Sequence, residues 1–143
     1  MDIARHIALI DELCHRPFPA ERGPSDTGFG APGHHVAVLE CAGDGDPADL
    51  AVAADQFEKG RDALYEVLAP RWGDVSPFNL RTLLLRTERE DIPEPWAGLC
   101  ARADVAWLWE VPGTARWVAV AVADRDPGEG LRLLAVVTDT APP

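Results

Sequence analysis

Hydrophobic residues gather in three runs in the last third of the chain, and two short segments containing proline and glycine separate them. The runs are residues 104–111, 116–123 and 131–138, and they are rich in valine, leucine and tryptophan, which favour strands. Runs of this length between turn residues are typical of antiparallel strands connected in sequence. The pattern therefore predicts a three-strand meander at the C-terminal end of the chain.

The first turn of this meander has two alternatives. A two-residue Pro-Gly turn would pair Val111 with Thr114, whereas a four-residue loop over 112–115 would pair Val111 with Arg116. We favour the longer loop, because an unprimed Pro-Gly turn matches the twist of paired strands poorly.

The two faces of the meander differ in bulk, because side chains alternate along a strand. One face carries Trp107 and Trp109 with valines of the second strand. A buried tryptophan removes on the order of 200 Å² from water, so we expect this face in the core. The other face is shallower and places one large residue among small ones: Trp117, Ala119, Ala121 and Ala123.

Helical and strand patterns alternate ahead of the meander. Apolar residues recur at helical spacing in three segments: 2–14, 47–69 and 93–103. Asp46 suits the N-cap of the second helix and Pro47 its first position, while Gly60 weakens its middle. Two further segments are predicted strands, 34–41 and 78–87, although the length of the second also suits a buried helix.

This order predicts a single α+β domain over residues 1–143, with a frayed tail at 139–143. We expect a mixed sheet of about five strands that ends in the antiparallel meander, with two longer helices packed on one face. If the strands at 34–41 and 78–87 are neighbours, they are parallel and joined by a right-handed crossover.

The segment 17–33 is crowded with glycine and proline and has no period. A structureless stretch of this length is either disordered or functional. We favour a disordered or passive surface loop. The alternative is a lid or partner-contacting loop anchored by Phe18 and Phe29.

The net charge is −11 and the pI is near 4.6. An acidic surface repels nucleic acid and anionic membranes, and it suits a basic protein partner. The longest apolar run, 117–123, is too short to span a bilayer. Isolated cysteines and a start without a signal pattern favour reduced thiols in the cytoplasm. Abundant arginine, alanine, glycine and proline, with one lysine and one asparagine, indicate a GC-rich bacterial genome.

No motif for catalysis, metal or cofactor binding stands out. His34 and His35 point to opposite faces of a strand and do not share a metal readily. Cys14 lies on the apolar stripe of a helix, so core packing is favoured over a thiol nucleophile. Neither acidic turn, 44–46 or 124–129, completes a calcium loop, and no glycine-rich phosphate loop is present. We therefore expect no metal, no cofactor and no catalytic residue.

Two functional hypotheses follow. The first is a non-enzymatic, acidic protein-interaction module, such as an immunity or antitoxin-like protein, an accessory subunit or a homodimer. Its binding surface would combine a large aromatic residue with nearby acidic ones: Trp117, Glu110, Asp124, Asp126 and Glu129. The alternative is a small-molecule-binding protein or modest enzyme, in which segment 17–33 covers a pocket edged by His34, His35 and tryptophans.

Overall fold

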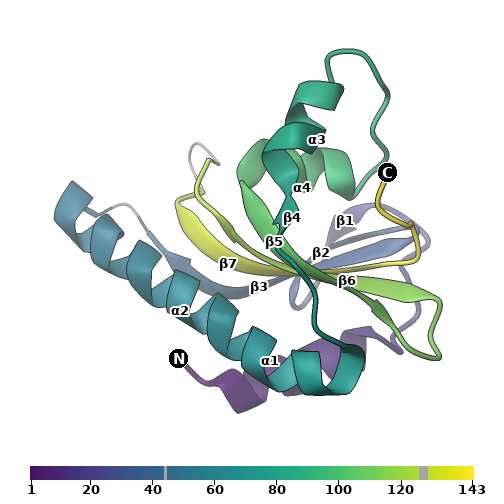
Figure 1. The fold of residues 1–143 in the computed structure, drawn as a ribbon, viewed down its shortest axis with the longest axis horizontal. Coiled ribbons are helices and arrows are strands. Elements are labelled where there is room, and N and C mark those ends of the chain that lie inside the picture. Colours follow the sequence, from purple (N-terminus) through teal and green to yellow (C-terminus); the bar gives the residue numbers. More distant parts are fainter. Residues whose placement is uncertain (44, 126–128) are drawn as a thin grey trace.

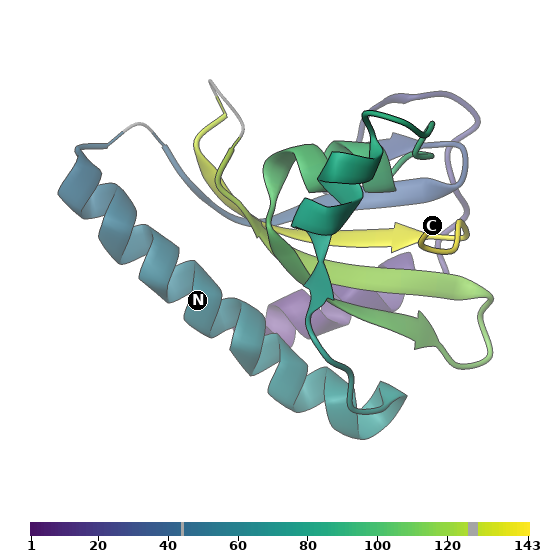
Figure 2. The ribbon, with the colours of Figure 1, turned by 45° about the horizontal axis from the view of Figure 1, so that its top comes forward.

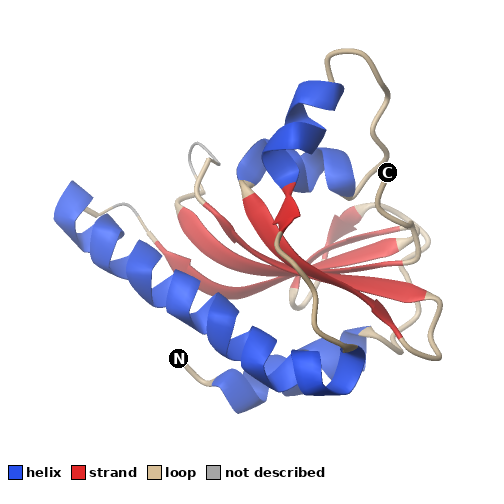
Figure 3. Ribbon diagram, in the orientation of Figure 1, coloured by secondary structure: helices blue, strands red, loops and turns tan. Residues whose placement is uncertain are grey.

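The computed structural model describes residues 1–43, 45–125 and 129–143. In this part of the chain one twisted sheet separates two pairs of helices (Figures 1 and 3). The helices are α1 (Ile3–Leu13), α2 (Pro47–Trp72), α3 (Leu80–Arg86) and α4 (Trp96–Arg102). The strands are β1 (Gly23–Pro24), β2 (Gly28–Ala31), β3 (His34–Ala42), β4 (Phe78–Asn79), β5 (Val105–Val111), β6 (Arg116–Ala123) and β7 (Leu131–Thr138).

The sheet has seven strands among the described residues, in the order β1-β2-β3-β7-β6-β5-β4, and all neighbours are antiparallel. The α+β class is confirmed, but a mixed sheet of about five strands is wrong. The additional strands β1 and β2 are two and four residues long, too short for a periodic pattern, and only two residues of the strand predicted over 78–87 form β4. Since β3 pairs with β7 and β4 lies at the far edge, no parallel crossover forms.

The predicted meander is confirmed as β5, β6 and β7. Val111 pairs with Arg116, so residues 112–115 form the four-residue loop. Gly113 and Ala115 have φ angles of 78° and 54°, and these positive values turn the chain within the loop. The register places Trp107 opposite Val120 and Trp109 opposite Val118.

The tryptophan and valine face of the sheet packs against α1 and α2 (Figure 2). Trp109 is 1% exposed, and its indole N–H donates to the carbonyl oxygen of Gly73 at 2.9 Å. Tyr65 and Trp72 of α2 contact this indole, with ring centres 5.7 and 5.8 Å away. Trp107 lies nearer the edge, is partly buried and donates to Asp62.

Gly60 in the middle of α2 has a packing role. A β-carbon at this position would lie 2.2 Å from the sulfur of Met1 and 3.6 Å from Leu133. The missing side chain therefore leaves room for the end of the Met1 side chain, at the cost in helix propensity that glycine carries.

The alanine face of the sheet is covered by α3 and α4. Ala106, Ala119, Ala121 and Ala123 are at most 1% exposed and form a second core with leucines of these helices and with Trp96. The strand predicted over 78–87 is wrong beyond Asn79, whose side chain accepts from the N–H groups of Arg81 and Thr82 and starts α3. A short apolar run fits a strand or a buried helix equally well.

Segment 17–33 is not a structureless loop, and the favoured expectation is wrong. Its second half forms the β1–β2 hairpin, which extends the sheet beyond β3. Phe18 anchors the first half between the ring of His35, 5.0 Å away, and the guanidinium of Arg116, 3.9 Å away. The same guanidinium donates to the carbonyl oxygens of Leu13 and Arg16 at the end of α1. Arg116 thus connects the hairpin segment to α1 and to β6.

A β-bulge after Val38 decides which face the end of β3 presents. The register shifts between Val38 and Glu40, so residues 34, 36 and 38 share one face while Glu40 turns to the opposite face. There its carboxylate lies 3.8 Å from the buried imidazole of His6 on α1. Without the extra residue, Glu40 would lie on the same face as Val38.

Candidate functional site

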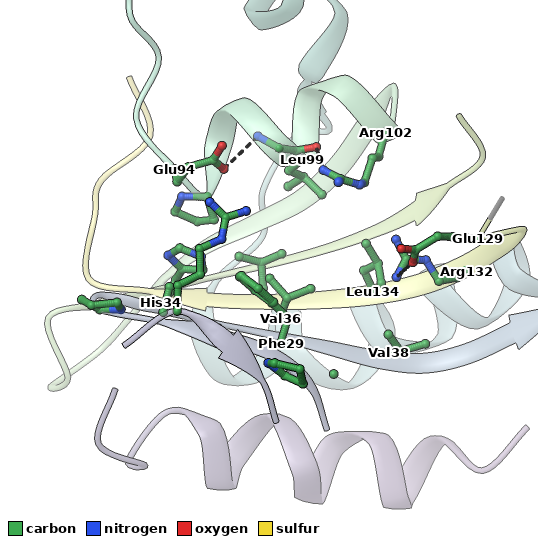
Figure 4. Close-up of a pocket in the computed structure, with 18 residues that line it drawn as sticks. Phe29, His34, Val36, Val38, Glu94, Leu99, Arg102, Glu129, Arg132 and Leu134 are labelled. Carbon is green, nitrogen blue, oxygen red and sulfur yellow. Dashed lines mark hydrogen bonds and ion pairs between the residues drawn. The ribbon is translucent and has the colours of Figure 1, made fainter. Parts of the chain in front are cut away.

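Helices α3 and α4 cover only part of their face of the sheet. The remaining part consists of β2, β3 and β7, and a cavity of about 580 Å³ lies between these strands and α4 (Figure 4). Ligand pockets in proteins typically measure roughly 300–1,000 Å³. The cavity is therefore large enough for a small organic molecule.

The floor of the cavity is apolar. Val36 and Val38 come from β3, and Leu134 and Val136 come from the paired positions of β7. Phe29 on β2 and Leu99 on α4 complete this lining on two sides. These strand residues share one face because they alternate with Ala37, Ala135 and Val137, which belong to the opposite core. A ligand that enters the cavity thus meets aliphatic and aromatic groups along its length.

One end of the cavity carries Arg22, His34 and Glu94. His34 is 7% exposed, and burial lowers its pKa below the ordinary value, with the charge of Glu94 opposing this shift. The guanidinium carbon of Arg22 lies 5.1 Å from the centre of the Phe29 ring. An oxygen of Glu94 accepts the backbone N–H of Gly98 at 3.0 Å in the first turn of α4. This end therefore presents a neutral imidazole beside charges of both signs.

The other end of the cavity carries Arg102, Glu129 and Arg132 (Figure 4). Arg132 forms an ion pair with Glu129 at 2.8 Å, and Arg102 donates to the carbonyl oxygen of Gly98 at 2.8 Å. Among the described residues that line the cavity, three arginines face two carboxylates. The lining has one net positive charge in a protein whose net charge is −11.

The structure separates the residues predicted to bind a protein partner. Glu110 is exposed and lies directly opposite the partly buried Trp117 on the neighbouring strand. Asp124 is exposed beyond the other end of β6, seven residues from Trp117 and roughly 23 Å away at strand spacing. Glu129 lines the cavity, and Asp126 lies outside the described residues.

The shallow face itself lies beneath α3 and α4, so only its edge around Trp117 is accessible. Whether Trp117 and its acidic neighbours contact a partner stays a prediction.

The two adjacent histidines point to opposite faces of β3, as predicted. His34 lines the cavity, whereas His35 stacks on Phe18 and lies 3.3 Å from the carbonyl oxygen of Arg16. Of the residues that the alternative hypothesis placed at the edge of a pocket, His34 lines this cavity, whereas His35 and the tryptophans are not among its described lining residues. Within the described ranges, no cluster of three or more histidine, cysteine, aspartate or glutamate side chains could hold a metal ion.

The three thiols lie in different environments. Cys14 lies at the end of α1 and is buried in the main core, and burial raises its pKa to about 11. Cys100 is buried in the second core, where burial also raises its pKa. Cys41 is exposed near the end of β3. Neither buried thiol is activated as a nucleophile.

Sequence analysis missed four charged residues of the cavity: Arg22, Glu94, Arg102 and Arg132. They come from a hairpin, the approach to α4, α4 itself and β7, and no local spacing relates them. A partial signal was present in β7, where Arg132, Leu134 and Val136 alternate on the face opposite to Leu133 and Ala135.

Family models, curated proteins and solved structures offer no match to this chain. In the described part of the chain, no helix is both long and apolar enough to span a membrane. The geometry of the cavity is therefore the basis for assigning a function to this chain.

Proposed function

We propose that this protein binds a small, largely apolar molecule in the cavity between α4 and the sheet formed by β2, β3 and β7. The observation that carries the proposal is an apolar cavity of about 580 Å³ with polar side chains at both ends. Ligand sites commonly combine an apolar lining with a few placed polar groups. This function corresponds to the second of the two hypotheses drawn from the sequence, and the cavity is the reason for preferring it.

The shape of the fold supports the proposal. The β1–β2 hairpin contributes Phe29 and Ala31 to one wall, and α4 contributes Leu99 to the opposite wall. The hairpin continues a sheet whose other face is filled by α1 and α2, so its backbone is held by pairing to β3. A preformed wall of this kind lowers the ordering cost of binding.

A neutral apolar fluorophore tests the proposal. We expect 1-aminoanthracene to bind saturably at one site, with increased fluorescence in the apolar cavity. Val36→Trp places a bulky ring on the cavity floor and should weaken binding about tenfold or more, because it occupies space the ligand needs. Val67→Trp is the matched control, since Val67 is exposed on α2 on the opposite side of the sheet.

Both variants should keep the circular dichroism spectrum of the parent protein. Val38→Phe, at the neighbouring floor position, provides a second obstruction if Val36→Trp does not fold. Non-saturable binding, or equal binding by the parent and a folded floor variant, would contradict the proposal.

A protein-interaction module is the second candidate, favoured by the exposed Glu110 beside the partly exposed Trp117 and by the charge of −11. A basic protein is the partner such a surface would select. Trp117→Ala should then weaken binding of a partner captured from the native host by about 2 kcal/mol or more. Equal capture by this variant would exclude Trp117 as the contact.

A further inference from the structure

Two polar side chains at the same end of the cavity form no hydrogen bond or ion pair within the described residues. The first is His34, which is 7% exposed and whose imidazole forms no hydrogen bond there. Its nearest aromatic neighbour is Phe29, with ring centres 6.2 Å apart. No ring nitrogen of His34 is fully buried without a partner, so its N–H remains accessible to a ligand in the cavity.

The second is Arg22 on the hairpin. Its guanidinium forms no ion pair with any described carboxylate and instead lies over the Phe29 ring, 5.1 Å from the ring centre. Stacking on an aromatic ring holds a guanidinium in place while leaving its N–H donors available in the ring's plane. Arg22 and His34 line the same cavity, and both side chains lie next to the ring of Phe29.

We propose that this end of the cavity binds the carboxylate of an amphipathic monocarboxylate, an inference that rests on the proposed function. The carboxylate accepts hydrogen bonds from the Arg22 guanidinium and from the His34 N–H. The apolar body of the ligand then lies along Val36, Val38 and Leu134 toward the opposite end.

The neighbouring charges select a single negative charge on the ligand. Glu94 lies at the same end, and its carboxylate already accepts the N–H of Gly98. Glu94 and the overall charge of −11 oppose any anion, so only the charge that pairs with Arg22 is offset, and a second negative charge would find no second cation among the described residues at this end. A neutral head group would leave the guanidinium of Arg22 without a charged partner. A singly charged carboxylate therefore fits this end better than a dianion or an alcohol.

Displacement of 1-aminoanthracene by two ligands of equal chain length, decanoate and 1-decanol, tests the inference. We expect decanoate to displace the fluorophore at a concentration about tenfold or more below that of 1-decanol. Arg22→Gln should weaken decanoate binding roughly ten- to a hundredfold, as expected for loss of a charged hydrogen bond, and leave 1-decanol unchanged. His34→Phe keeps a ring in place and should also weaken decanoate selectively.

Arg5→Gln is the matched control, because it removes the same charge from an exposed position on α1, across the sheet from the cavity. If the fluorophore binds but 1-decanol competes as well as decanoate, or if Arg22→Gln leaves decanoate binding unchanged, the carboxylate site is wrong while the proposed function stands. If the fluorophore does not bind at all, the proposed function fails together with this inference.

Discussion

The two tryptophans of β5 provide a quantitative test of the main core. Trp109 is 1% exposed, contacts Tyr65 and Trp72, and donates its N–H to Gly73. Trp107 is on the same face of the same strand but is only partly buried, and its N–H reaches the exposed Asp62. We expect Trp109→Ala and Trp107→Ala to differ strongly in stability, although the removed atoms are the same.

The expected magnitudes follow from burial. Truncation of a fully buried tryptophan to alanine costs about 3–5 kcal/mol, and loss of the indole hydrogen bond is included in that range. A half-buried ring hides on the order of 100 Å², which is worth about 2.5 kcal/mol at most by area. Trp107→Ala should therefore cost about 1–2.5 kcal/mol, and the difference between the two variants should exceed about 0.5 kcal/mol.

Urea unfolding followed by far-ultraviolet circular dichroism measures both values, with equal slopes required for a direct comparison. A domain of this size has a free energy of unfolding of about 5–15 kcal/mol, so Trp109→Ala removes a large fraction of it. Trp109→Phe, which retains a ring, is the milder variant if the alanine variant does not fold. A loss for Trp107→Ala equal to or greater than that for Trp109→Ala would refute the core assignment.

Three further predictions concern protonation, thiol reactivity and helix packing. Burial lowers the pKa of His6, His34 and His35 below 6.5. The unfolded chain therefore binds protons before the folded one as the pH falls, and the free energy of unfolding should decrease from about pH 7 downward. A free energy of unfolding that does not change with pH would contradict the burial of these histidines. Cys41 should react with a disulfide reagent in the native protein, whereas Cys14 and Cys100 should react only after denaturation. Fast reaction of all three thiols in the native protein would contradict the burial of Cys14 and Cys100. Gly60→Ala should raise the free energy of unfolding by roughly 0.5–1 kcal/mol, because the exposed end of Met1 can move aside; a loss of stability would show that Met1 is held firmly.

The candidate cavity was only partly predictable. Sequence analysis expected segment 17–33 to cover a pocket edged by His34, His35 and tryptophans; in the structure, part of that segment and His34 line a cavity, and no tryptophan is among the described lining residues. It did not place Arg22, Glu94 or Arg102, because these residues meet only after the hairpin and α4 reach the same face of the sheet. It also assigned His35 to the pocket, whereas strand alternation turns that ring toward Phe18.

The sequence by itself determined the local elements whose periodicity or end signals are strong. These are the meander with its loop at 112–115, the long helix that begins after Asp46, and the opposite orientations of Trp109 and Trp117. Local signals are sufficient for these elements because the spacing of apolar residues along the sequence differs between a helix and a strand.

Tertiary structure alone decided which strands pair and what covers each face. The pairing of β3 with β7 joins residues about a hundred positions apart, and no local pattern specifies such a pair. The short strands β1, β2 and β4 are stable only because longer neighbours supply their hydrogen-bond partners. The cavity exists because α4 leaves part of the sheet face formed by β2, β3 and β7 uncovered. This arrangement depends on several distant segments, and no one of them carries a sequence signal for it.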